Sequence, residues 1–298
     1  MTVIQSPKLA PDINGRIQSY SWAYRGQVFN AVYETLGEGD PVLLLPAFST
    51  VSSRTEMAGI ARILAARFQV VALDWLGFGD SDRPALQYGR SLYQQFLQDF
   101  VENCFQQPVA IVAAGHAAGY AMNLAARHPE SCSKLILIAP TWKGPLRAMG
   151  VPIPLATGLK NTIRLPLLGQ ILYGVNTHPA FLRWMYKRHV FRDMTQLTPD
   201  LLAYKHEITQ HSGARFAPAA FVTGGLDPMD DRQTWLETGQ SLSQPVQAIV
   251  ASLAPPKSKA EMLALAALPS IEAREVPGTL GAHEEYSEVV GAIALQFL

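Results

Sequence analysis

The chain has 298 residues, of which 48% are hydrophobic and 16% are charged, and its formal net charge at pH 7 is zero. That length allows one large α/β domain with an insertion and a core that needs no disulfides, so the two cysteines, Cys104 and Cys132, favour a reducing cytosol over an extracellular scaffold. The neutral balance and the lack of aromatic and basic interleaving argue against a nucleic-acid partner.

The first predicted elements are two strands, residues 16–22 and 27–33, which alternate apolar and polar side chains. A turn at residues 24–26 joins them as an antiparallel pair. Residues 1–22 contain prolines and charged residues where a signal peptide has an apolar core. We therefore expect no targeting segment and predict a cytoplasmic protein.

Strand and helix patterns then alternate along the chain. The predicted strands are residues 41–45, 69–73, 109–113 and 134–139, and the predicted helices are residues 57–67, residues 92–104 and a helix that ends at Arg127-His128-Pro129. Such alternation is typical of a mostly parallel sheet with helices on both faces. The predicted fold class is therefore α/β.

This alternation stops at residue 140. Residues 140–213 contain prolines, aromatic residues and basic residues in short helical stretches without a strand pattern. Strand patterns resume at residues 219–223, 246–250 and 272–276. We therefore predict a core made of residues 1–139 and 214–298, with residues 140–213 inserted as a helical lid.

The lid carries most of the charge asymmetry of the chain. Residues 141–215 contain 10 Lys and Arg against 3 Asp and Glu, which leaves 14 basic and 21 acidic residues elsewhere. Arg183, Lys187, Arg188 and Arg192 recur at roughly helical spacing. We expect a basic stripe that contacts an anionic membrane surface or an acidic head group, and the alternative is a solvated face.

The lid is also rich in large apolar side chains, among them Trp142 and Trp184. Such residues line pockets for apolar or lipid-like ligands, and we predict that these two tryptophans contact the ligand. The alternative is that they pack the lid on the core. Prolines and charged residues interrupt the apolar stretch 151–175, which is too broken to span a bilayer.

Residues 115–119, Gly-His-Ala-Ala-Gly, follow a predicted strand and match the pattern G-x-S-x-G except at the centre. In that pattern a serine stands on a strained strand-to-helix turn, where a histidine activates it. Gly115 and Gly119 retain the small residues of this elbow, but Ala117 has only a methyl group. Loss of the nucleophile costs about 10⁶ in turnover, so ordinary acyl-enzyme hydrolysis is excluded for this chain. We expect His116 to be a structural hydrogen-bonding residue.

Two more segments extend this match to a family. Leu43-Leu44-Leu45-Pro46-Ala47-Phe48 stands where α/β-hydrolases have a strand followed by His-Gly, and residues 74–84 are close to the D-x-x-G-x-G-x-S-x-x-P signature. From about residue 20 to its end, apart from the lid, the chain resembles an α/β-hydrolase. Residues 139–146 and 217–224 resemble those of cyanobacterial and plastid proteins with a G-H-A-A elbow.

The resemblance implies roles for further residues. Asp227 would be the acid and His283 the base, which follow position 117 in the order that this fold uses. The oxyanion hole would consist of the backbone N–H groups of Phe48 and Ala118. The departure is Pro46-Ala47 in place of His-Gly, which removes one donor. No cofactor or metal is expected, because the seven histidines include no H-x-x-x-H pair and no G-x-G-x-x-G follows the first strand.

Three functional hypotheses follow. In the first, alanine is native at position 117 and the protein binds an apolar or lipid-like ligand without acyl-enzyme turnover. In the second, Ala117 replaces the serine of an ester or lipid hydrolase and the protein is a disabled enzyme. In the third, His283 acts as a general base in lyase or hydrolase chemistry that needs no nucleophile.

Overall fold

The computed structural model describes residues 12–298, so residues 1–11 of the predicted core lie outside the described residues. Eight strands form one sheet in the order β1-β2-β4-β3-β5-β6-β7-β8. They are β1 (Arg16–Tyr24), β2 (Gln27–Leu36), β3 (Pro41–Leu45), β4 (Gln69–Leu73), β5 (Val109–Ala114), β6 (Cys132–Ile138), β7 (Val246–Ala251) and β8 (Ile271–Val276). Strand β2 pairs with β1 and β4 antiparallel, and the other pairs are parallel, which confirms the predicted α/β class.

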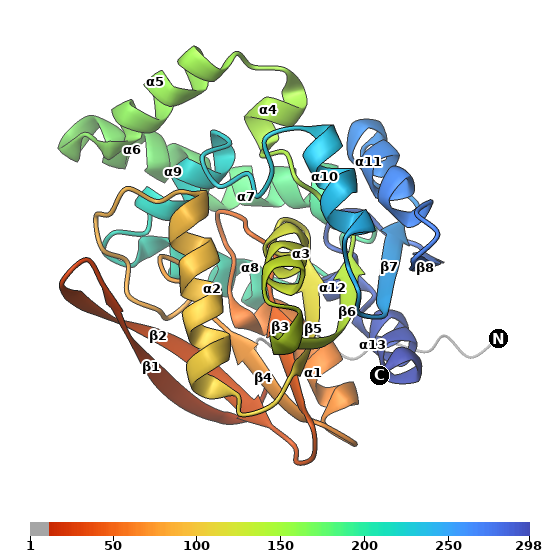
Figure 1. Ribbon diagram of the computed structural model, residues 1–298. Helices are drawn as coiled ribbons and strands as arrows, with labels where there is room; N and C mark the ends of the chain where they lie inside the picture. The colour runs from red at the N-terminus through yellow and green to blue at the C-terminus, as the bar shows by residue number, and fades with distance from the viewer. Residues whose placement is uncertain (1–11) are drawn as a thin grey trace.

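Helices cover both faces of the sheet (Figure 1). Those outside residues 140–213 are α1 (Ala58–Leu64), α2 (Arg90–Cys104), α3 (Ala117–Arg127), α9 (Phe216–Val222), α10 (Arg232–Gln240), α11 (Pro256–Ala266), α12 (Ala282–Glu285) and α13 (Ser287–Phe297), with 3₁₀ turns η1 (Arg54–Met57) and η2 (Pro129–Ser131). Successive residues of β3 point to opposite faces, so Leu43 and Leu45 pack with α2 and α3, whereas Val42 and Leu44 pack with α1 and α13. The apolar strands are therefore buried on both sides.

Helices fill the connection from β6 to β7, and the described residues of this connection contain no strand. They are α4 (Pro145–Met149), α5 (Ile153–Arg164), α6 (Pro166–Thr177), α7 (Pro179–Met185), the π-helix η3 (Tyr186–Val190), α8 (Pro199–Glu207), the 3₁₀ turn η4 (Ile208–Gln210), α9 (Phe216–Val222) and then α10. Each of α4 to α8 has a proline in its first turn, where no backbone N–H is needed. The prolines that interrupt the strand pattern thus start helices.

The strand expected at residues 219–223 is wrong, because this stretch lies in and just after α9. The Thr223 hydroxyl donates to the Ala219 carbonyl at 2.7 Å, as a side chain at the end of a helical turn does. A short apolar run has the same appearance in a buried strand and in a buried helix. As a result, Asp227 follows a helix and does not stand at the end of a strand.

The segment that resembles the D-x-x-G-x-G-x-S-x-x-P signature forms a turn after β4. The Asp74 carboxylate accepts the backbone N–H groups of Arg54 at 2.5 Å and Asp80 at 2.9 Å. Gly79 has φ +50° and no room for a Cβ, which would collide with that carboxylate. The Ser81 hydroxyl donates to the Asp74 carbonyl and accepts a backbone N–H of β2, both at 2.8 Å. The motif therefore holds the end of β4 against β2 and η1 by hydrogen bonds.

Candidate functional site at the turn after β5

The bend between β5 and α3 is at Gly115, which has φ +54°. This left-handed conformation suits glycine because it has no Cβ. Ala117 is already the first residue of α3, and its side chain is fully buried in the core beside α2. The prediction that Ala117 stands at the bend is therefore wrong by two residues. The five-residue match placed the centre of the pattern inside the helix.

The bend offers no side chain for chemistry and little room for one. A Cβ built on Gly115 would lie 3.0 Å from the Ala47 Cβ, closer than such atoms normally approach. Ala47 stands where the family usually has glycine, so its methyl group occupies space beside the bend. The same Cβ would lie 3.9 Å from Thr141 Oγ1, the hydroxyl nearest to this position among its closest neighbours.

The Thr141 hydroxyl lies beside the bend because β6, the neighbour of β5, ends just before it. Thr141 donates its backbone N–H to the Gly115 carbonyl at 3.1 Å. Ala139, the residue directly after β6, has φ +43°, an uncommon conformation for a residue other than glycine. This backbone turns the half-buried Thr141 toward the elbow. Sequence reasoning overlooked Thr141, although a hydroxyl soon after the neighbouring parallel strand is a usable signal.

His116 lies between Thr141 and Asp227 and is hydrogen-bonded to Thr141. The Nδ1 atom of His116 lies 2.7 Å from Thr141 Oγ1, and its Nε2 atom lies 3.5 Å from Asp227 Oδ1. The imidazole and the carboxylate are both buried. With the proton on Nε2, where it faces the carboxylate, Nδ1 accepts the hydroxyl proton of Thr141. The structure thus brings a hydroxyl, an imidazole and a carboxylate together. Only Asp227 belongs to the set expected from the sequence, which is position 117, Asp227 and His283.

Asp227 is held by the chain around it. Its carboxylate accepts the Gly144 backbone N–H at 2.7 Å and the Arg147 guanidinium at 3.0 Å. Gly119 of the predicted elbow lies beneath this loop, since a Cβ there would collide with Pro228. The glycine therefore allows α3 to approach the loop that carries Asp227.

His283 does not meet Asp227. The residues around Asp227, Leu226 and Met229, pack in the core with α2 and α3, whereas Ala282 beside His283 packs in the core with α1 and α13. The residues that flank the two side chains thus pack on opposite faces of the sheet, and His283 contacts Glu56 and not Asp227, so the expected acid and base pair does not form. The strand that precedes the last one is β7, and the residues after it, 252–256, are Ser-Leu-Ala-Pro-Pro, which include no carboxylate.

His283 belongs instead to a buried charged cluster. Its Nε2 atom lies 3.4 Å from Glu56 Oε2, and the fully buried Lys205 ammonium lies 3.1 Å from Glu56 and 2.9 Å from Glu284. Burial opposes the charge on Lys205, but Glu284 and Glu56 outweigh it and raise the pKa of Lys205 well above its usual value. Burial alone would raise the pKa of Glu56, but Lys205 and His283 hold it below its ordinary value. The cluster fastens α8 of the insertion to the core.

The two predicted oxyanion donors differ in their surroundings. The backbone N–H of Ala118 donates to the Gly115 carbonyl at 3.3 Å, inside the first turn of α3. Phe48 follows β3, and its ring is buried in an aromatic cluster where it stacks on Trp75 at 4.8 Å between ring centres. The Ala118 amide is therefore already used within the helix. With the bend at Gly115, the amide that follows it is that of His116.

The two predicted ligand residues do not share a pocket. Trp142 is buried in the core beside α3, whereas Trp184 is exposed on α7, where its ring contacts that of Phe181 in a tilted arrangement at 5.5 Å between ring centres. Phe181 lines a shallow apolar groove of about 670 Å³ between α6 and α7. The other residues of this groove are Ile171, Gly174, Val175, His178 and Ala180. Only Trp184 therefore stands close to a surface suited to an apolar ligand.

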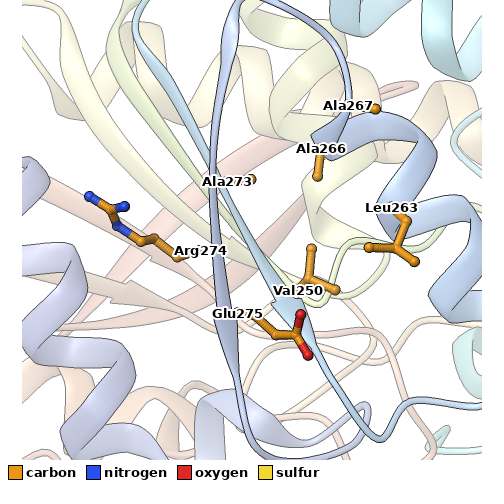
Figure 2. Close-up of a pocket in the computed structure, with 7 residues that line it drawn as sticks. All are labelled: Val250, Leu263, Ala266, Ala267, Ala273, Arg274 and Glu275. Atoms are coloured by element: carbon orange, nitrogen blue, oxygen red, sulfur yellow. The ribbon is translucent and has the colours of Figure 1, made fainter.

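A smaller hollow of about 330 Å³ lies between α11, β7 and β8 (Figure 2). Leu263 and Ala266 of α11 face Val250 there, while the Arg274 side chain points away. The residues that line it contain no hydroxyl, thiol or imidazole. Within residues 12–298, no group of three or more His, Cys, Asp and Glu side chains is arranged to hold a metal ion.

The strand order, the turn after β5 and the helical insertion after β6 define a protein of the α/β-hydrolase class. Residues 42–282 match the Alpha/beta hydrolase family, and the chain belongs to that family.

Sequence relatives match only parts of this chain. An uncharacterized protein of Mycobacterium tuberculosis is 31% identical over 111 residues, 37% of this chain and 32% of its own length. A 2-hydroxymuconate semialdehyde hydrolase of Pseudomonas putida is 30% identical over 159 residues, 53% of this chain and 51% of its own length. The chain thus spans about a third to a half of the length of these curated relatives.

Solved structures match nearly the whole fold. A protein named Cfl2 from Burkholderia cenocepacia superposes with a TM-score of 0.74 at 20% identity, covering 97% of both chains. The enol-lactonase of Burkholderia xenovorans has a TM-score of 0.70 at 16% identity, covering 93% of this chain and 99% of its own. At such identities the likeness concerns the fold alone.

Proposed function

We propose that this member of the family binds an apolar, lipid-like ligand and does not form an acyl-enzyme at the turn after β5. The observation that carries the proposal is the glycine at the bend. A nucleophile elbow acts by holding a hydroxyl or thiol exposed on that turn, and Gly115 has neither. The side chain of Ala117, which the sequence pattern puts in the role of the serine, lies in the core.

The groove between α6 and α7 is the site that we assign to the ligand. Ile171, Val175 and Phe181 give it apolar walls. Its volume, about 670 Å³, is in the range of pockets that hold small molecules. Trp184 contacts Phe181 at the rim and extends the apolar surface.

Gly174→Trp is expected to weaken binding of a pyrene-labelled fatty acid by about tenfold or more, because the indole fills the groove. Fluorescence titration measures the change. Gly158→Trp on α5 is the matched control, since a Cβ at Gly158 or Gly174 meets no atom within 4 Å and neither variant strains the helix. Equal affinities for the two variants would argue against this groove as the ligand site.

Ala117→Ser is expected to restore neither hydrolysis of p-nitrophenyl butyrate nor labelling by a fluorophosphonate. The new hydroxyl would stand inside α3, fully buried and two residues past the bend. If position 117 were instead the nucleophile position of a disabled hydrolase, the serine should raise turnover by about 10⁶, the usual cost of losing the nucleophile. Such a gain would overturn the proposal.

A second candidate function has one specific observation in its favour, the contacts that join Thr141, His116 and Asp227. In this alternative, Thr141 Oγ attacks an ester carbonyl while His116 Nδ1 takes the hydroxyl proton, and the same proton then goes to the departing alcohol. Water would release the acyl group from Thr141 by the reverse proton path. This route differs from the third hypothesis, in which His283 acts as a general base and no nucleophile is needed.

Hydrolysis by the unmodified protein distinguishes the two candidates. The binding proposal expects no turnover of p-nitrophenyl butyrate. The alternative expects turnover that falls by about 10³ or more in Thr141→Val and in His116→Gln, with an acyl group found on Thr141 by mass spectrometry. His283→Gln is the matched control, because this histidine lies on the opposite face of the sheet.

A further inference from the structure

Helix α6 exposes the face that a surface helix normally buries. Residues 167, 168, 171, 172 and 175 recur at helical spacing on one side of it, and all of them are exposed leucine, isoleucine or valine. The side turned toward the protein carries Gly169, Tyr173 and Thr177, which are buried. We call these five exposed residues the α6 stripe. Leu167 is 83% exposed, and α6 contains no charged residue.

The α6 stripe borders a groove that it shares with α7. Ile171 and Val175 of the stripe line the groove whose other wall includes Phe181. Phe181 contacts the half-exposed Trp184, and the guanidinium of Arg188 lies 5.7 Å from the centre of the Trp184 ring. The apolar side chains of α6, the aromatic pair and the basic side chains of α7 are thus neighbours. Figure 1 shows α5 and α6 projecting from the body of the molecule. Exposed apolar surface of this extent marks an interaction site.

The charge of the insertion identifies the partner. Residues 141–192 contain eight Lys and Arg and no Asp or Glu. Three of the basic residues, Arg183, Lys187 and Arg188, are exposed around Trp184. A second copy of this chain would bring two positively charged surfaces together, whereas anionic lipid head groups would neutralise them. Tryptophan is also favoured at the boundary between water and acyl chains.

We propose that the α6 stripe and the basic end of α7 form a docking surface for an anionic lipid bilayer. The stripe would lie among the acyl chains near the surface while Arg183, Lys187 and Arg188 contact the head groups. None of the helices in residues 12–298 is long and apolar enough to cross a bilayer. The proposal does not depend on the turn after β5, because no residue of that turn takes part, but it shares Ile171 and Val175 with the groove assigned to the ligand.

Flotation with lipid vesicles tests the docking surface. The protein should bind vesicles in which about a third of the phosphatidylcholine is replaced by phosphatidylglycerol, and bind pure phosphatidylcholine vesicles more weakly. Leu167→Ser with Ile171→Ser should weaken binding by about tenfold or more through loss of buried apolar area. Arg183→Glu with Arg188→Glu should weaken it by a similar factor on the anionic vesicles only, and about 0.5 M salt should do the same.

The control is Leu263→Ser with Val289→Ser, which removes two exposed apolar side chains from helices α11 and α13. It should bind like the unmodified protein. Because all four residues are exposed, both double variants should keep the melting temperature of the unmodified protein. The proposal is wrong if the protein does not bind anionic vesicles or if the control variant loses as much vesicle binding as the stripe variant. It is also wrong if the stripe variant converts a dimer into monomers without changing vesicle binding.

Discussion

Lys205→Met is expected to lower the free energy of unfolding by about 3–5 kcal/mol, the usual cost of removing one partner from a buried ion pair. The ammonium is fully buried between Glu56 at 3.1 Å and Glu284 at 2.9 Å. Methionine has a similar volume but leaves two buried carboxylates without a cation. Urea unfolding at neutral pH measures the loss. Lys257→Met is the control and should change stability by less than about 0.5 kcal/mol, because Lys257 is exposed.

The pH dependence of the variant should separate a lost ion pair from lost packing. In the unmodified protein the pKa of Glu56 is lowered, so its contribution to stability is present above about pH 4.3, the unfolded value, and disappears as the pH falls through the lower folded value. In Lys205→Met two buried carboxylates face each other and their folded pKa values should rise. Folding then takes up a proton, so the variant should regain stability as the pH falls from about 7 to 5.

Removing all the charges together completes the test. Lys205→Met combined with Glu56→Gln and Glu284→Gln leaves no buried charge between these three positions. It should recover part of the loss, since the penalty comes mainly from unpaired charge. If the single variant loses less than about 1 kcal/mol, or becomes less stable on mild acidification, the cluster does not hold α8 on the core as described.

The sequence predicts the fold of this chain well because the fold depends on regular patterns. The buried runs 41–45, 69–73 and 109–113 coincide with strands β3, β4 and β5, since apolar residues of this length between turn signals have one favourable place in an α/β protein. The run 219–223 fails because periodicity cannot distinguish a short buried strand from a buried helix. Because of that error, the sequence pattern places Asp227 at the end of a strand, whereas it lies in the loop after α9.

The site is harder to predict because it depends on single atoms and on which face of the sheet a loop reaches. Gly115 and Ala117 are both small, so the pattern alone does not show which of them takes φ +54°. His283 stands in the expected part of the chain, yet Glu56 lies beside it and Asp227 lies across the sheet. Contacts such as that of His116 with Thr141 join residues 25 positions apart, and no local pattern reveals them.

Arg54→Met is the second substitution expected to cost about 3–5 kcal/mol in the free energy of unfolding. The buried guanidinium bonds Glu34 of β2 at 3.0 Å and Asp74 after β4 at 2.5 Å, and it also reaches Asp80 at 2.7 Å. Burial opposes this charge, but Asp74 and Asp80 outweigh it and raise the pKa of Arg54 above its usual value. Methionine would leave two carboxylates buried without a cation, and urea unfolding would show the loss.

Two further variants make this expectation specific. Arg54→Lys keeps the charge but has one nitrogen in place of the two, Nε and Nη1, that contact Glu34 and Asp74, so an intermediate loss is expected. Asp80→Asn should cost about 1 kcal/mol or less, because the Asp80 side chain is 46% exposed. If Arg54→Met costs no more than Asp80→Asn, this ion-pair network does not hold the turn after β4. If the loss is largest for Arg54→Met, intermediate for Arg54→Lys and smallest for Asp80→Asn, the turn after β4 has a structural role. That role explains why the turn retains the family signature although the bend after β5 has no nucleophile.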